Sequence, residues 1–184
     1  EVSLGNDGNI SMKNLKNCIN NDLANNYGNL CQRVFSFIKK NCSNKIPKPK
    51  SLDKIDLKLL NSLKNNVPNL IRLMNSQNLN EYIKSVVGYS FEANKYFNDL
   101  EPWSVKKKNP ERMQAILFTA SEQIKNISIL LNAIIPSTTE KVFDSMNLKK
   151  KDISLNLISS LESFDHNKEL KNLDILFNKI ENDN

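Results

Sequence analysis

The chain has 184 residues, 39% of them hydrophobic and 25% charged, which is enough for one domain with a substantial core. Four glycines and 7% aromatic residues are too few for the many turns of a β-sandwich or barrel, so the composition favours an all-α fold. The net charge of +6 favours an anionic partner, and residues 29–50 carry six basic side chains without an acidic one.

The first predicted elements are a connector and a long helix. Residues 1–10 are rich in glycine and asparagine and are expected to be the connector. A helix is predicted from Ser11, which can cap its first turn, to about Cys42. Gly28 lies inside this helix, where glycine lowers helix stability by up to ~1 kcal/mol relative to alanine. Either helix packing or the close approach of another backbone or a ligand explains a glycine there.

Four further helices complete the predicted bundle. After a loop fixed by two prolines, the second is expected over residues 52–75, with an interruption or kink near Pro68. Asn78 can cap a third helix that ends near residue 100, and Asn109 a fourth that ends near residue 134. Ser137 and Glu140 form a capping box for a fifth, ending near residue 147. The prediction is therefore an all-α bundle of about five helices over residues 11–148.

The C-terminal segment, residues 149–184, is treated separately. Its stretch LNLISSLESF is predicted to form one more helix, and the segment is expected either to dock on the bundle or to be loose. Because the chain begins with Glu1 and not methionine, we expect it to be a fragment of a larger protein.

Catalytic and metal-binding patterns are not found in the sequence. The single histidine, His166, has polar neighbours and is expected at the surface, and there is no glycine-rich phosphate loop. No carboxylate has a local reason for a shifted pKa. Cys18, Cys31 and Cys42 lack metal-ligand spacing, which indicates reduced, buried thiols of a cytoplasmic protein. We expect no catalytic residue, no metal site, no signal peptide and no membrane span.

Asn29 and Arg33 are candidate recognition residues on the first predicted helix. The apolar stripe of that helix is formed by Leu23, Leu30, Val34 and Phe37. Asn29 and Arg33 stack along the flank of this stripe, a position that suits side chains lining a groove. Only three of the 26 basic residues are arginines, so Arg33 indicates a need for the planar guanidinium fork. An amide and a guanidinium can read the edges of unpaired bases.

Trp103 is the only tryptophan and a candidate stacking surface. It follows Glu101 and Pro102 at the end of the third predicted helix, where an indole can project from the core. A projecting indole can accept a base for ~1–3 kcal/mol. Each residue also has a purely structural alternative. Trp103 would pack as a hydrophobic side chain at the end of the helix, and Arg33 would form an ion pair with Asp22 or Glu101.

Three segments, DLANNYGNLCQR, EANKYFNDLEPW and LNAIIPSTTEKVFDSMNL, resemble in that order the anticodon-binding helical domain of bacterial methionyl-tRNA synthetases. The opening EVSLGNDGNIS resembles the stretch that joins the catalytic domain of that family to the bundle. The closing ILFNKIE is similar to its terminal segment, with Asn178 and Lys179 where the family usually has proline and arginine. The likeness covers nearly all of the chain and is loosest between residues 42 and 78.

The resemblance implies an ATP- and Mg²⁺-dependent methionine–tRNA ligase whose catalytic domain lies outside this chain, so that the 184 residues alone are inactive. It implies that this part binds the CAU anticodon loop of tRNA(Met), with Trp103 stacking on the first anticodon base, Pro102 orienting the indole, and Arg33 and Asn29 reading bases. Contacts to phosphates would then come from Lys39, Lys40, Lys106, Lys107 and Lys108. The expected partners are this loop and the catalytic domain of the same chain, with neither membrane nor DNA.

Two alternatives remain open at this level. One is the same domain of another class I synthetase, for cysteine or valine, although the set of Asn29, Arg33 and Trp103 favours methionine. The other is a helical module whose apolar flank binds a partner helix. RNA binding weakens steeply as salt rises, whereas binding in a hydrophobic groove is nearly indifferent to salt.

Overall fold

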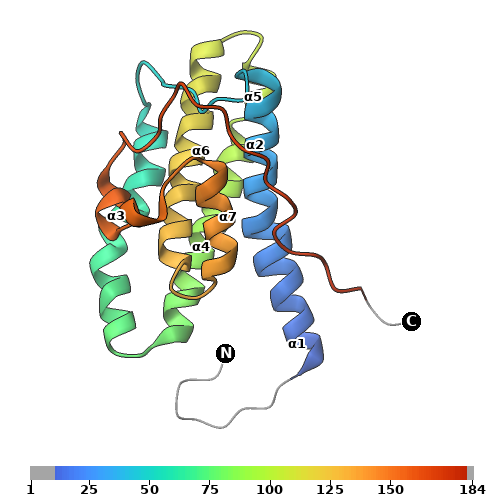
Figure 1. The fold of residues 1–184 in the computed structure, drawn as a ribbon, viewed down its shortest axis with the longest axis vertical. Helices are drawn as coiled ribbons and strands as arrows, with labels where there is room; N and C mark the ends of the chain where they lie inside the picture. Colours follow the sequence, from blue (N-terminus) through green and yellow to red (C-terminus); the bar gives the residue numbers. More distant parts are fainter. Residues whose placement is uncertain (1–10, 182–184) are drawn as a thin grey trace.

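The computed structural model describes residues 11–181, so the expected connector at residues 1–10 and residues 182–184 lie outside the described residues. Five helical rods form the bundle, the first of them built from α1, η1 and α2 in succession, and this confirms the predicted all-α architecture (Figure 1). The described elements are α1 (Met12–Asn17), η1 (Cys18–Gly28), α2 (Asn29–Asn41), α3 (Lys54–Asn75), α4 (Leu79–Asp99), α5 (Pro102–Val105), α6 (Pro110–Leu131), α7 (Pro136–Ser145), η2 (Lys150–Asp152) and η3 (Leu155–Ser159).

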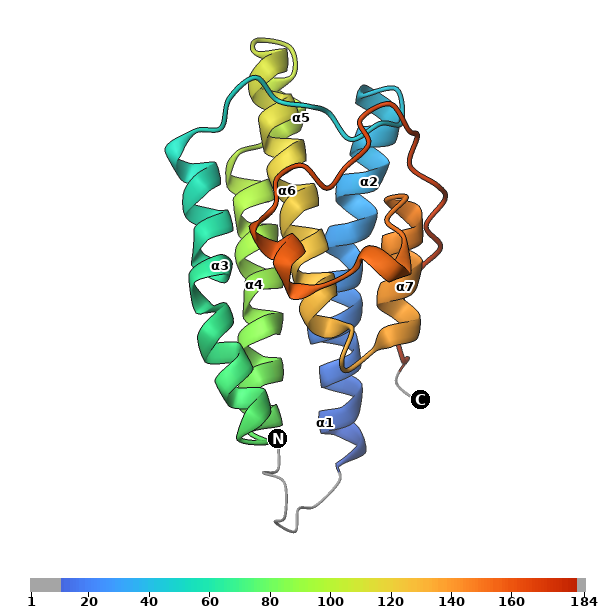
Figure 2. The same cartoon turned by 60° about the vertical axis from the view of Figure 1, so that its left-hand side comes forward.

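Helix α6 is the centre of the fold. It stands between the α3–α4 pair and the first rod, with α7 packed beside it (Figure 2). Every residue from Ala115 to Leu131 is buried, so the helix is surrounded by the other elements and its polar side chains also lie in the interior. Within residues 11–181, no helix is both long and apolar enough to cross a bilayer.

The first rod has the predicted extent, but its middle is a π-helix, η1, which the sequence did not predict. The Ser11 side chain caps α1 by accepting from the amide of Asn14 at 3.4 Å. A Cβ atom at Gly28 would stand 3.2 Å from both the Leu23 carbonyl oxygen and Cδ2 of Phe177. The absence of a side chain at Gly28 therefore allows the C-terminal segment to lie against the rod.

Local capping signals located most helix starts. The Asn78 side chain accepts from the Glu81 amide, and the Asn109 side chain accepts from the Arg112 amide, as predicted. The start of α3 has a reciprocal capping box between Asp53 and Asp56. This helix then runs without interruption through Pro68, so of the predicted interruption or kink the interruption is wrong.

The start of α7 differs from the prediction, and one short helix before α6 was not predicted. Helix α7 begins at Pro136, because proline suits the first helical position, and Ser137 is not its cap. The Thr139 hydroxyl instead donates to the Asn132 side chain at 2.8 Å. The turn after α4 contains a short helix, α5, that begins at Pro102.

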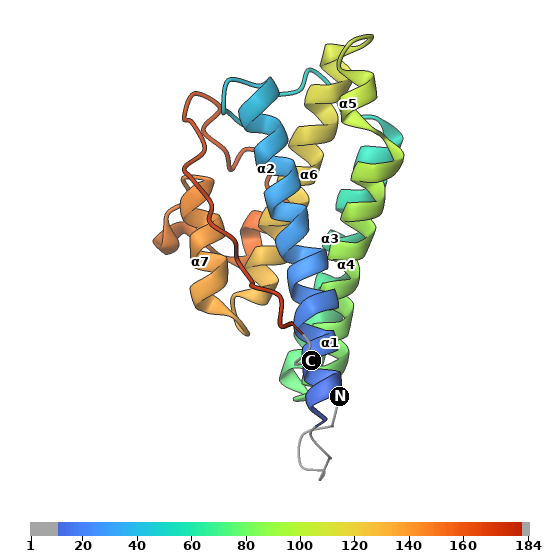
Figure 3. The same ribbon diagram turned by 90° about the vertical axis from the view of Figure 1, so that its right-hand side faces the viewer.

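Residues 149–181, which we call the strap, dock on the bundle. The helix predicted at LNLISSLESF is wrong: only short 3₁₀ turns form, because the Ser160 carbonyl and the Ser163 hydroxyl bond to the buried ammonium of Lys125. The strap then runs to the first rod, where the Asn20 side chain exchanges two hydrogen bonds of 2.9 Å with the backbone of Ile180 (Figure 3).

Candidate nucleic-acid interface

Arg33 of α2 and Trp103 of α5 meet on a single phenyl ring, that of Phe97 in α4. The Arg33 guanidinium carbon lies 5.3 Å from the Phe97 ring centroid. The indole of Trp103 meets the same ring edge-on at 6.0 Å between centroids. We call these three residues the ledge. The structure thus brings together two side chains that lie 70 positions apart in the sequence.

The polar partner of Arg33 is Asn98, not either of the two acids considered from the sequence. Its Nη2 donates to the Asn98 Oδ1 at 2.7 Å. This single bond leaves the remaining N–H donors of the fork available in a part-exposed position. Phe97 and Asn98 were not identified as site residues from the sequence, although both stand in the quoted segment EANKYFNDLEPW.

The backbone around Pro102 explains how Trp103 projects. Glu101 has a left-handed conformation, with φ of 41°, and its carbonyl accepts from the amides of Ser104 and Val105 at 2.8 and 3.1 Å. Pro102 is buried at the first position of α5, whereas Trp103 keeps 39% of its surface exposed. The indole is therefore neither a core side chain nor a free one: part of it is packed on Phe97 and part of its surface is open.

Basic side chains border the ledge. The Lys106 Nζ donates to the Asn41 side chain at 3.1 Å and lies 5.8 Å from the Phe37 ring centroid. Four further lysines of α2 and the α5–α6 turn are exposed, namely Lys39, Lys40, Lys107 and Lys108. The C-terminal end of α2 and the α5 turn lie at the same end of the bundle (Figure 1), so the ledge adjoins a positively charged end.

Asn29 is exposed one helical turn before Arg33 and lines a hollow of ≈ 300 Å³ between the first rod and the strap. The Gln32 side chain, which also lines this hollow, joins the strap to the rod by donating to the carbonyls of Leu173 and Asp174 at 3.0 and 2.9 Å. The strap therefore forms a second wall beside Asn29, a neighbour that the sequence did not predict.

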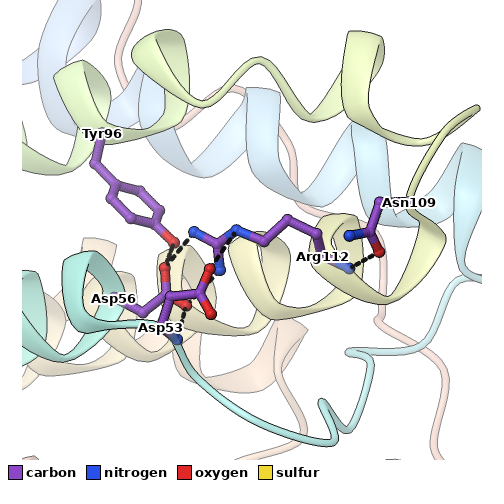
Figure 4. Close-up of polar contacts among 5 residues, drawn as sticks. All are labelled: Asp53, Asp56, Tyr96, Asn109 and Arg112. Atoms are coloured by element: carbon purple, nitrogen blue, oxygen red, sulfur yellow. Dashed lines mark hydrogen bonds and ion pairs between the residues drawn. The ribbon is translucent and has the colours of Figure 1, made fainter.

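A buried ion-pair network joins α3, α4 and α6 (Figure 4). Asp56 is fully buried and accepts from the Tyr96 hydroxyl at 2.6 Å and from two nitrogens of Arg112 at 2.5 and 2.8 Å. Burial raises the pKa of Asp56, but the bonds from Arg112 and Tyr96 outweigh it, and the pKa lies below its usual value. We call Asp56, Tyr96 and Arg112 the clamp.

The other ionisable groups differ from the sequence-based expectations. Burial raises the pKa of Glu122 to about 7, against the opposing effect of Lys125, so the expectation of unshifted carboxylates is wrong for both Glu122 and Asp56. His166 is half-buried, with Nδ1 3.0 Å from the Ile46 carbonyl.

The cysteines and carboxylates do not assemble into a metal centre in the part of the chain that the structure describes. Cys18 is exposed, so burial is confirmed fully only for Cys31, while Cys42 is intermediate. No group of three or more histidine, cysteine or acidic residues within residues 11–181 could hold a metal ion.

The fold defines the class first. The chain superposes on the apo form of Mycobacterium tuberculosis methionyl-tRNA synthetase with a TM-score of 0.91 and 24% identity, over 100% of this chain and 37% of that one. The bundle thus has the fold of part of an aminoacyl-tRNA synthetase.

The family follows from sequence. Residues 46–184 match the family model of the anticodon binding domain of methionyl tRNA ligase. The methionine–tRNA ligase of Rickettsia felis is 36% identical over 155 residues, which cover 83% of this chain and 30% of that protein. That of Brucella suis is 35% identical over 144 residues, covering 78% and 28%. The chain belongs to the family of anticodon-binding domains of methionyl-tRNA ligases, and neither alternative considered above is favoured.

Proposed function

We propose that this chain binds the CAU anticodon loop of tRNA(Met) as part of a cytoplasmic methionine–tRNA ligase. The observation that carries the proposal is the meeting of Arg33 and Trp103 on Phe97. Unpaired loop bases can splay out, stack on an aromatic face and offer their edges to a guanidinium a few ångströms away. Trp103 stacks on the first anticodon base, Pro102 fixes the indole, and Arg33 and Asn29 read base edges.

Phosphate contacts position the RNA in this proposal. They come from the exposed lysines at the ledge end of the bundle, Lys39, Lys40, Lys106, Lys107 and Lys108. Such contacts fix orientation without reading sequence. The surface next to the ledge is well suited to them because it carries positive charge on both α2 and the α5 turn.

The ligase reaction belongs to the whole protein in this proposal. The chain spans about 30% of the length of the curated relatives it matches. In this proposal ATP and Mg²⁺ bind the catalytic part of the protein. This chain contributes no catalytic residue.

A double-substitution cycle tests the role of Trp103. Binding of wild type and Trp103→Ala is measured at one fixed salt concentration to an anticodon stem-loop with C at the first anticodon position and to one with that base replaced. Loss of the stack weakens binding to the C-containing loop by ~1–3 kcal/mol. Replacing the base should weaken RNA binding by wild type strongly and RNA binding by Trp103→Ala much less.

The control is stability. A core tryptophan cut to alanine costs ~3–5 kcal/mol, and a smaller loss is expected here because the ring is 39% exposed. If the loss of binding free energy from Trp103→Ala and the loss from the base change simply add in a folded protein, Trp103 does not contact that base.

A further inference from the structure

The clamp joins the two ends of the segment that carries Trp103. Tyr96 is in the last turn of α4 and Arg112 is in the first turn of α6. These two residues flank the segment 97–111, and both donate hydrogen bonds to the same carboxylate. That carboxylate, Asp56, belongs to a third element, α3, and is fixed in turn because its Oδ2 accepts from the Asp53 amide at 2.8 Å. Three helices are thus held at one buried point (Figure 4).

The register of α4 at this point decides where the ledge lies. Tyr96 and Phe97 are adjacent, so they project about 100° apart around the helix. Tyr96 points toward Asp56, and Phe97 contacts both Arg33 and Trp103. A rotation or slide of the last turn of α4 would therefore move the surface on which both base-reading side chains rest.

The chemistry of the clamp suits positioning better than stability. Buried ion pairs are often replaceable by apolar groups without loss of stability, because removing two charges from water offsets their attraction. The bidentate pairing of Arg112 with Asp56 is directional, and a lysine could not reproduce it. The chain has only three arginines, and one of them is used here.

We propose that Asp56, Tyr96 and Arg112 are positioning residues that hold the α4–α5–α6 segment so that Trp103 and Arg33 stand in the geometry that reads a base. In this proposal the clamp does not contact the RNA. It acts through Phe97 and through the two ends of the segment 97–111 that carries α5. The part of this inference that concerns RNA rests on the proposed function, whereas the part that concerns the placement of Trp103 does not.

Tyr96→Phe is the sharpest variant, because it removes one hydroxyl and leaves the Asp56–Arg112 pair intact. Tyr82→Phe is the matched control: its hydroxyl is also buried in α4 and donates to the Leu130 carbonyl at 2.7 Å, but it lies outside the clamp. Because Trp103 is the only tryptophan, its fluorescence anisotropy and its quenching by acrylamide report directly on the ledge.

We expect Tyr96→Phe to lower the anisotropy and raise the quenching of Trp103, and Tyr82→Phe to leave both at wild-type values. Binding to the C-containing stem-loop should weaken by roughly five- to tenfold in Tyr96→Phe, the lower end of the loss expected for one base stack. Arg112→Lys should show the same fluorescence change, because charge without the fork does not restore the clamp.

The outcomes separate the two proposals. Equal quenching in Tyr96→Phe, Tyr82→Phe and wild type would overturn the positioning role. Changed quenching together with weaker, less base-selective binding supports both the clamp and the base-reading ledge. Changed quenching with unchanged RNA binding would leave the clamp standing as the support of Trp103 and would remove the ledge from the proposed function.

Discussion

At Arg33 one guanidinium makes a ring contact and a hydrogen bond at the same time. Its central carbon lies over the Phe97 ring and Nη2 donates to Asn98. The Lys106 ammonium makes the same two kinds of contact with Phe37 and Asn41, so what arginine adds at position 33 is the planar fork, whose remaining N–H groups can form a bidentate contact. Because lysine occupies most other basic positions of the chain, the arginine at position 33 indicates that the planar shape of the guanidinium is needed there.

Arg33→Lys should weaken binding to the anticodon stem-loop almost as much as Arg33→Ala, by ~1–3 kcal/mol if one bidentate base contact is lost. Thermal stability should change little, since the side chain is part-exposed. Equilibrium binding and melting curves of both variants measure this. Arg72→Lys is the control: Arg72 is exposed on α3 and also donates to an asparagine, Asn69, at 2.7 Å. Wild-type binding by Arg33→Lys would mean that Arg33 serves only as a charge.

The strap is attached to α6 through one buried lysine. The Lys125 Nζ donates to Glu122 Oε2, to the Ser160 carbonyl and to the Ser163 hydroxyl at 2.6, 2.8 and 2.9 Å. All three protons of the ammonium are thus used, two of them on the strap. Phe164 lies on the same group, with its ring centroid 5.6 Å from Nζ.

Lys125→Met should destabilise the protein by ~3–5 kcal/mol, because it breaks a buried ion pair and removes the two hydrogen bonds to the strap. The double variant Glu122→Leu with Lys125→Met should recover the part of this loss that comes from the unpaired carboxyl group, whereas the part that comes from the strap remains. Urea unfolding of the two variants beside wild type measures both effects. A double variant less stable than the single one would contradict the argument.

Sequence patterns predicted the elements whose causes are local. The caps at Asn78 and Asn109 depend on residues within one turn, and both were confirmed. The path of the strap could not be predicted, because it depends on contacts of Ser160 and Ser163 with Lys125, 35 and 38 positions away. Arg33 and Trp103 were identified as candidates, but their shared support, Phe97, required the packing of α4 against α2.

At the scale of the whole molecule, the clamp links stability to pH. Its residues stand 40 and 56 positions apart, so no local pattern predicted it. The pKa of Asp56 is lower in the folded protein than in the unfolded chain, where an aspartate has a pKa of about 3.9. The ionised carboxylate therefore stabilises the fold above that pH, and this contribution is lost as the pH falls through the folded-state pKa.

The wild type should lose more unfolding free energy between pH 5 and pH 3 than Asp56→Asn, which lacks the titrating group. The variant should be less stable at pH 7 and should show a shallower acid slope. Urea unfolding at a series of pH values measures both quantities. Parallel slopes for the two proteins would exclude Asp56 as a source of acid sensitivity.

The reciprocal bonds between Asn20 and Ile180 have a consequence for the order in which the chain assembles. They join residues 160 positions apart, so the loop that they close contains nearly the whole described chain. Contacts of such separation are entropically the most costly to form before the intervening chain has folded. During synthesis the residues of the ledge and the clamp also leave the ribosome before the strap does. The ledge and the clamp are thus built first and the strap is laid over a finished bundle, so the end of the strap can open and close again without unfolding the helices beneath it.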